Sequence, residues 1–260
     1  MALLNGVPVD VAKLKTLALA NYGHFSTMLV ADLQVRGLAL HLARLARDCR
    51  LLFDAELDPD RVRRLLRQAL AEFTEPVVAR VTVFDPGLDI GHPGADAQPY
   101  VLITTRPAPT VAGSPVRLRT ARYLRDMPEV KHVGLFSLMR HRRIAQRSGF
   151  DDVLLVDERS RIAEAATSNI GFFDGKRLVW PQAPCLPGVT MDLLCQAHDG
   201  PLDCRPLSVA EAAHLPLAFI TNAVVGICEI RVIDDVLWPA AHSVLDVLRA
   251  EYAAIPTESL

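Results

Sequence analysis

Residues 162–173 read IAEAATSNIGFF, two short apolar runs separated by a polar turn. Apolar runs of this length on either side of a turn predict a strand-turn-strand unit. The unit carries Glu164 in its first strand and Asn169 at the start of its second. On the residue types alone, Glu164 is consistent with a surface carboxylate, and Asn169 with an ordinary turn residue.

The sequence around this unit predicts a largely extended second half of the chain. Short apolar runs bounded by turn residues recur there, which is typical of strands. Ser208 and Glu211 have the spacing of a helix capping box, which predicts one short helix among the strands. The remaining expected elements are strands at 116–123, 152–157, 161–165, 169–173, 177–180 and from 218 to 221, and helices at 135–148, after Thr190 and at about 240–252.

The first half of the chain mixes helical and extended patterns. Apolar residues at three- and four-residue spacing predict helices at 38–52 and 58–73. The expected strands are a pair within 24–36 and two more at 77–84 and 100–105, which flank the Gly- and Pro-rich loop 85–99.

One stretch has the composition of a linker. Residues 107–115 read PAPTVAGSP, and such Pro- and Gly-rich segments commonly separate domains. We therefore expect an α+β protein of two domains. The predicted division is a small α+β domain at 1–108, a linker at 109–115 and a larger domain at 116–260.

The composition excludes several classes of function. Of the 260 residues, 50% are hydrophobic, so the chain can bury a core, and its net charge of −2 lacks the basic surplus that nucleic acid or an anionic membrane requires. We expect no signal peptide, and the most apolar tract, 215–230, is too short to span a bilayer. We expect a cytoplasmic protein with a small-molecule partner, no nucleic acid and no membrane.

The cysteines point to a reducing compartment. There are five, they lie far apart and none forms a CxxC pair. This pattern indicates neither a disulfide framework nor a zinc site, so no bound metal is expected.

A single lysine stands out in the middle of the chain. Lysine is rare here, with Lys131 and three others among 28 basic residues, so charge is otherwise supplied by arginine. A lysine amine can form a Schiff base with a carbonyl cofactor, whereas a guanidinium cannot, because it is never deprotonated in a protein. The alternative is a solvated lysine just before the helix predicted at 135–148.

Two further segments could bind a phosphate. Residues 186–190, LPGVT, precede a predicted helix, and free N–H groups at a helix start together with a close-fitting glycine can cradle an anion. Residues 41–45, HLARL, place Arg44 beside the buried stripe of the first long helix, and a guanidinium suits phosphate. The alternatives are a Pro-Gly turn with a threonine cap and an exposed helix arginine.

The order of these segments resembles a known family. The sequence contains HxxRL at 41–45, Lys131, ExxxSN at 164–169, LPGVT at 186–190 and the run FITNAVVGI at 219–227. In this order they resemble the class IV (fold-type IV) pyridoxal-phosphate enzymes over residues 2 to 240. That family includes branched-chain and D-amino acid aminotransferases and aminodeoxychorismate lyase.

The resemblance implies a fold and a cofactor, pyridoxal 5′-phosphate. The fold would be a small α/β domain and a larger pseudo-barrel domain, with the cofactor in the cleft between them. Lys131 would form the internal aldimine and shuttle a proton during reaction with a small primary amine or amino acid, while Glu164 would pair with the pyridinium nitrogen. The other implied cofactor-binding residues are Arg44, Asn169, Gly188, Val189, Thr190, Asn222 and Ala223. A homodimer is implied as well.

Several positions depart from the family pattern. Phe136 stands where aminotransferases usually have a tyrosine that hydrogen-bonds the cofactor's phenolic oxygen, and the Thr221-Asn222-Ala223 run also resembles the lyases. Ala223 lacks the phosphate-binding hydroxyl of many aminotransferases. Aminodeoxychorismate lyase-type β-elimination releasing pyruvate is therefore an alternative to transamination, and a catalytically inactive cofactor-binding protein is another.

Three residues near these motifs have open roles. His24 follows a shortened Tyr-Gly segment and is a candidate for substrate specificity, or else a core or surface histidine. Arg122 and Arg125 precede Lys131 and could meet a substrate carboxylate, although surface pairing with a nearby carboxylate explains them equally well.

Overall fold

The computed structural model describes residues 1–109, 114–240 and 242–260, and the chain divides into two compact units. The first unit contains Met1–Ala108, Val130–Gly134 and Pro256–Leu260, and the second contains Pro109–Glu129 and Leu135–Ile255. Residues 110–113 of the predicted linker and residue 241 of the last predicted helix lie outside the described residues. The domain boundaries expected from composition stay a prediction.

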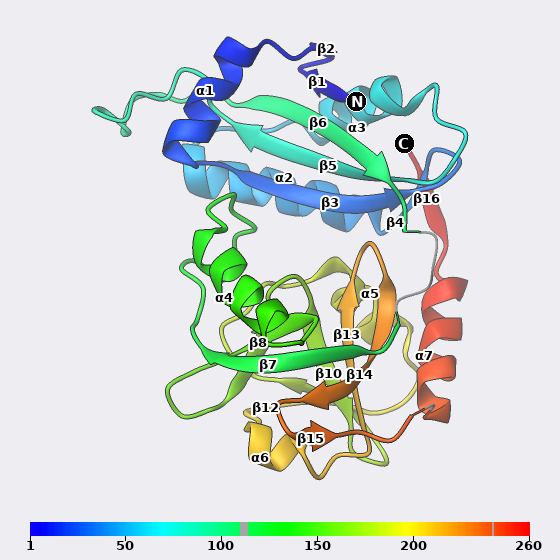
Figure 1. Ribbon diagram of the computed structural model, residues 1–260. Helices are drawn as coiled ribbons and strands as arrows, with labels where there is room; N and C mark the ends of the chain where they lie inside the picture. Colours follow the sequence, from blue (N-terminus) through cyan, green and yellow to red (C-terminus); the bar gives the residue numbers. More distant parts are fainter. Residues whose placement is uncertain (110–113, 241) are drawn as a thin grey trace. The chain divides into compact units, whose positions relative to one another are not determined.

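The first unit is built around a five-stranded antiparallel sheet, in the order β2-β1-β6-β5-β3 (Figure 1). Its strands are β1 (Ala2–Leu4), β2 (Val7–Pro8), β3 (His24–Val30), β5 (Val77–Phe84) and β6 (Tyr100–Pro107). β3 pairs with β5 over its whole length, from His24 opposite Val83 to Val30 opposite Val77. The strands expected at 77–84 and 100–105 are confirmed.

Helices cover both faces of this sheet. Alternate residues of a strand point to opposite faces, so Val81 and Val83 of β5 join the main core while Phe84 joins a smaller one. The main core is completed by α2 (Leu38–Phe53) and α3 (Pro59–Leu70), and the smaller one by α1 (Val11–Ala20). Both α2 and α3 were expected from their apolar periodicity.

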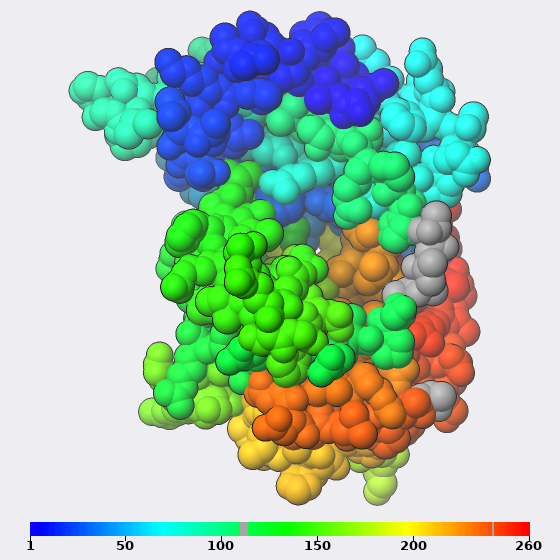
Figure 2. Space-filling view, viewed as in Figure 1, coloured from blue at the N-terminus to red at the C-terminus, as the bar shows by residue number. Residues whose placement is uncertain are grey.

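Two other features complete the first unit. β4 (Gln34–Arg36) pairs with β16 (Thr257–Ser259), so the end of the chain is attached beside α2. The loop 85–99 between β5 and β6 stands out from the unit as a projection (Figure 2), and every residue of its tip, 89–96, is exposed.

The second unit is built on a nine-stranded mixed sheet that curls back on itself. The order is β12-β11-β10-β13-β14-β7-β8-β9, with β15 beside β14. An isolated bridge between Ala165 and Ser168 connects the end of β9 to the start of β10, and seven of the strands contribute residues to one apolar core. The strands are β7 (Val116–Arg122), β8 (Asp152–Val156), β9 (Ile162–Ala165), β10 (Asn169–Phe173), β11 (Leu178–Pro181), β12 (Leu202–Arg205), β13 (Leu217–Asn222), β14 (Gly226–Ile233) and β15 (Val236–Leu237). The expected pseudo-barrel is confirmed.

Four helices belong to the second unit: α4 (Phe136–Arg147), α5 (Val189–Ala197), α6 (Val209–Ala212) and α7 (Ser243–Ala254). The predicted capping box of α6 is present, with both the Ser208 and the Glu211 side chains bonded to backbone N–H groups. Within the described ranges, no helix combines the length and apolar character needed to cross a bilayer.

Candidate functional site

Arg44 is buried in the first unit and is held by a serine. Its side chain projects from α2, the residue is 7% exposed, and Nη2 donates a hydrogen bond to Ser26 Oγ at 2.6 Å. Ser26 lies on β3, where it is also buried. The alternative of an exposed helix arginine is therefore wrong.

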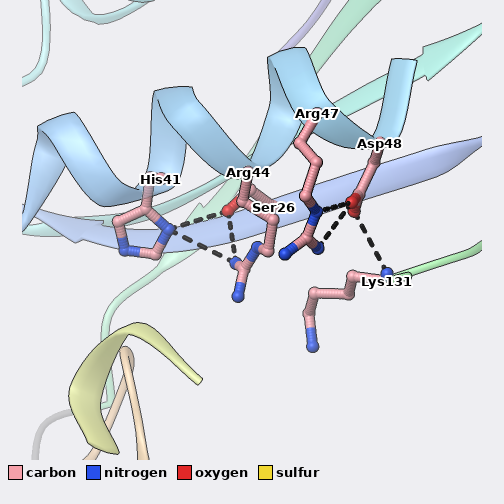
Figure 3. Close-up of polar contacts among 6 residues, drawn as sticks. All are labelled: Ser26, His41, Arg44, Arg47, Asp48 and Lys131. Carbon is pink, nitrogen blue, oxygen red and sulfur yellow. Dashed lines mark hydrogen bonds and ion pairs between the residues drawn. The ribbon is translucent and has the colours of Figure 1, made fainter. Parts of the chain in front are cut away.

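The same serine connects Arg44 to His41, one turn earlier on α2 (Figure 3). Ser26 Oγ lies 2.7 Å from His41 Nδ1. Because Ser26 accepts a hydrogen bond from Arg44, its own hydroxyl proton is available to His41 Nδ1, which then acts as an acceptor. Burial, and after it the charges of Arg44 and Lys131, lower the pKa of His41 well below its usual value. The imidazole is therefore neutral, and the positive charges next to it are those of Arg44 and Lys131.

Lys131 lies in the same unit as this cluster. Its Nζ is 5.1 Å from the centre of the Phe25 ring, and its carbonyl oxygen accepts a hydrogen bond from Phe25 N–H at 2.9 Å. In Figure 3 the ends of the Lys131 and Arg44 side chains both point away from the axis of α2, on the same side. The structure thus gathers two cations around a neutral histidine, which favours an anionic ligand.

His24 is a core residue of the first unit. Its side chain is 0% exposed, and neither ring nitrogen has a hydrogen-bond partner among the described residues. Burial first, and then the charges of Arg44 and Arg47, lower the pKa of His24 to about 3. The ring is therefore neutral at physiological pH, and the alternative of a surface histidine is wrong.

Glu164 is buried in the second unit beside the loop 186–190. It is 4% exposed, and its Oε2 accepts a hydrogen bond from Leu186 N–H at 3.4 Å. Its Oε1 lies 3.7 Å from Nη1 of Arg125, which is buried as well, whereas Arg122 is exposed. The alternatives of a surface glutamate and of an Arg125 that pairs at the surface are wrong.

Asn169 shapes the loop that leads into α5. Its Nδ2 donates to the Leu186 carbonyl oxygen at 2.7 Å, and a Cβ added to Gly188 would lie only 1.9 Å from Asn169 Oδ1. Only glycine fits this position. Gly188 is also the N-cap of α5 and supplies no side-chain acceptor, so the first amides of the helix, at Val189 and Thr190, are not capped by its own residue.

Two buried hydroxyls near this loop have no partner among the described residues, Thr190 Oγ1 and Thr221 Oγ1. Thr221 stands opposite Asn169 in the pairing of β10 with β13. Buried polar groups are almost always hydrogen-bonded in folded proteins. Two orphan hydroxyls together with uncapped helix amides fit the phosphate of the cofactor implied by the sequence. Thr221 was not predicted as a site residue.

Asn222 and Ala223 lie in the turn after β13. The Asn222 side chain is engaged inside this turn, since Oδ1 accepts the N–H groups of Val224 and Val225 and Nδ2 donates to Ser168 Oγ at 2.9 Å. Ala223 has no polar side-chain group. Ala223 can therefore contribute to ligand binding only through its backbone, whereas Asn222 also has the second N–H of Nδ2.

The predicted site residues fall into two groups, one in each unit. Lys131 and Arg44 belong to the first unit. The second unit holds Glu164, Asn169, Gly188, Val189, Thr190, Asn222 and Ala223. Phe136, the first residue of α4, is 80% exposed in the second unit.

Comparisons with known proteins give a consistent family. The model of the amino-transferase class IV family matches residues 23–233. Comparison of the sequence with curated proteins gives no match.

Among solved structures, three relatives are similar over nearly the whole chain. The PLP-bound form of a hypothetical aminotransferase from Mycobacterium tuberculosis has a TM-score of 0.84 and 20% identity, covering 98% of each chain. The branched-chain aminotransferase from Thermoproteus uzoniensis with norvaline has a TM-score of 0.87 and 18% identity, covering 97% of this chain and 93% of its own. The 4-amino-4-deoxychorismate lyase from Pseudomonas aeruginosa has a TM-score of 0.79 and 27% identity, covering 96% and 97%.

Proposed function

Since this chain belongs to the class IV aminotransferases, we propose that it is a pyridoxal-phosphate-dependent enzyme that uses Lys131 to act on a small primary amine or amino acid. The observation that carries the proposal is the family match over residues 23–233, which contains the lysine, the buried arginine and the loop before α5. The similar structure from Mycobacterium tuberculosis is a PLP-bound form, which supports the choice of cofactor.

Each unit contains groups suited to the phosphate of the cofactor: Arg44 in the first unit and the start of α5 in the second. The guanidinium of Arg44 is fixed by Ser26, so its planar donors are pre-oriented. The amides of Val189 and Thr190 and the Thr190 hydroxyl supply further donors of the kind that bind phosphate at helix N-termini. Because His41 is neutral, it adds no charge of its own to that of Arg44.

We assign the pyridine nitrogen of the cofactor to Glu164. A carboxylate next to this nitrogen keeps it protonated, and the bound cofactor then withdraws electrons from the bonds at the substrate's α-carbon. Nη1 of Arg125 lies 3.7 Å from Glu164 Oε1, so the carboxyl group has a cationic neighbour. The hydrogen bond from Leu186 orients the same group.

Lys131 has two tasks in this proposal. Its amine would hold the cofactor through the aldehyde. The same amine, when free, would move a proton at the substrate's α-carbon. Only a group with a basic nitrogen can do both, which is why arginine cannot replace it.

A lyase reaction is the second candidate. The identity to the Pseudomonas aeruginosa lyase is 27%, against 18% to 20% for the two aminotransferases above. Phe136 cannot make the hydrogen bond that the usual tyrosine makes, which is the other feature in favour of β-elimination. A protein that binds the cofactor but has lost turnover is the third candidate.

The first experiment asks whether the cofactor is bound and where. The protein reconstituted with pyridoxal phosphate is expected to absorb visible light, and borohydride is expected to fix the cofactor on Lys131, located by peptide mass spectrometry. Lys131→Ala should abolish both, while Lys176→Ala, which removes an exposed lysine, should change neither. A colourless wild-type protein with no cofactor uptake would contradict all three candidates.

The second experiment separates the candidates. The loaded protein is incubated in turn with L-amino acids, D-amino acids and aminodeoxychorismate. Stoichiometric keto acid without a second substrate indicates transamination, and catalytic pyruvate from aminodeoxychorismate indicates the lyase. No product from any of them favours the binding protein.

We also propose that the protein is a cytoplasmic homodimer. The family resemblance supports the homodimer, and five cysteines without a disulfide pattern support a reducing compartment. Sedimentation equilibrium of the full chain, with one subunit at 28.5 kDa, gives the oligomeric state directly.

A further inference from the structure

The backbone around Lys131 is fastened to the start of β3. Val130–Gly134 belongs to the first unit, although the residues on both sides of this segment belong to the second. Phe25 N–H donates to the Lys131 carbonyl oxygen at 2.9 Å, and Val133 N–H donates to the Gly23 carbonyl oxygen at 2.9 Å. The carbonyl side of the Lys131 peptide is therefore fixed by main-chain bonds.

The amide of Lys131 is fixed by a side chain instead. It donates to Oδ2 of Asp48 on α2 at 3.2 Å. Asp48 is 0% exposed, and an ionised acceptor makes a stronger bond than a neutral one. Because the carbonyl and the amide of Lys131 are both bonded, the direction in which its side chain leaves the backbone is determined by β3 and α2 together.

A buried carboxylate needs a compensating charge, and Arg47 supplies it. Arg47 Nε and Nη2 donate to Asp48 Oδ1 at 2.9 and 2.6 Å. Figure 3 shows the guanidinium of Arg47 on one side of the Asp48 carboxylate and the backbone nitrogen of Lys131 on the other, with the Lys131 side chain running back below the guanidinium. The carboxylate thus joins the partly exposed side chain of Arg47 to the backbone of the lysine.

We propose that Asp48 is a positioning residue for Lys131 and that Arg47 is its counter-ion. The inference rests on the proposed function, because it assigns to Asp48 the task of aiming the amine that reacts. The Lys131 amine must reach the cofactor and afterwards the substrate's α-carbon from one backbone position. A displacement of about 1 Å at such a group can lower a rate roughly a hundredfold.

The first test is amide hydrogen exchange at Lys131 in the cofactor-free, full-length protein, which reports the bond to Asp48 without turnover. Asp48→Ala removes the acceptor and is expected to speed exchange at this amide at least about tenfold. Asp48→Asn keeps a carbonyl acceptor and should stay within about threefold of the wild type. Glu56→Ala is the matched control, since it removes an exposed carboxylate that pairs with Arg50 of the same helix at 2.7 Å.

The second test uses the loaded enzyme. In Asp48→Ala, the pH midpoint of the visible absorption band is expected to shift and kcat to fall about tenfold to a hundredfold, with Asp48→Asn restoring most of both. A purely structural role would lower stability without moving this midpoint. Wild-type exchange at Lys131 together with a wild-type midpoint in Asp48→Ala would overturn the proposal.

A pair of variants keeps the test decisive if Asp48→Ala does not fold. Arg47→Ala leaves the buried carboxylate without its counter-ion and is expected to speed exchange at Lys131, while Arg47→Ala/Asp48→Asn, which has no charge to compensate, should return towards the wild type. A double variant no better than Arg47→Ala would overturn the counter-ion role. Failure of the proposed function would be visible separately, as a wild-type protein in which borohydride fixes no cofactor on Lys131.

Discussion

Replacing His24 with leucine is expected to change how the stability of the first unit depends on pH. The side chain is 0% exposed and its two nitrogens lack partners among the described residues. Burial, with a further contribution from Arg44 and Arg47, lowers the pKa of His24 from 6.5 to about 3. Leucine has a similar volume and no polar atoms, so we expect the core to accept it.

The magnitude follows from proton binding. Between pH 6.5 and about 3, the unfolded chain binds a proton at His24 that the folded protein does not bind. The free energy of unfolding therefore falls by about 1.4 kcal/mol for each pH unit below 6.5. Above pH 6.5, His24 does not contribute to the pH dependence of stability. From about pH 7.5 to pH 5 the wild type should lose roughly 2 kcal/mol through His24, and the leucine variant should not. His41 makes the same contribution to the pH dependence of both proteins, so it cancels in the difference between their free energies of unfolding.

The assay is urea unfolding of the cofactor-free protein at these two pH values. Far-UV circular dichroism is the suitable probe, because both tryptophans, Trp180 and Trp238, belong to the second unit and would not report on the first. The exposed His92, changed to Gln, controls for the general loss of an imidazole. If the difference in stability between His24→Leu and the wild type were the same at both pH values, the argument from burial would be refuted.

Three further outcomes are expected from other residues. Thr190→Val should not lower the stability of the cofactor-free protein but should raise the Kd for pyridoxal phosphate roughly tenfold in an absorbance titration, because its buried hydroxyl has no partner among the described residues. Gly188→Ala should weaken uptake more than Thr190→Val does, because its Cβ would lie 1.9 Å from Asn169 Oδ1 and displace the loop; equal affinities would contradict this role. Burial raises the pKa of Cys49 and Cys195 to about 11, so iodoacetamide near pH 7.5 should label the exposed Cys204 first, as read by peptide mass spectrometry.

The fold was predictable where burial imposes a period on the sequence. α2 and α3 place an apolar residue on the core at every turn, and their predicted positions are confirmed. α1 was missed because none of its residues is fully buried, so its sequence carries no strong period. β12 was missed for a related reason: it is a mostly exposed edge strand that pairs in parallel with β11.

The candidate site was predictable as a set of motifs but not as a set of contacts. The order of the segments that contain Arg44, Lys131 and Glu164 indicated the family, and the family model supports that interpretation. The partners of these residues come from distant parts of the chain, as Ser26 does for Arg44 and Arg125 for Glu164. The spacing of residues within a motif does not reveal such long-range pairs.

Asp48 nevertheless left a signal in the sequence. It precedes Cys49 and follows the stripe of Leu42 and Leu45, so it stands at the edge of the buried face of an amphipathic helix. A carboxylate in that position must either turn outward or find donors, because an unpaired buried charge is too costly. Arg47 accounts for one oxygen only, and the second oxygen requires a donor from elsewhere in the fold. That donor is the amide of the one lysine whose chemistry the sequence had singled out, and this coincidence is the reason to treat the carboxylate as part of the site rather than as a structural ion pair.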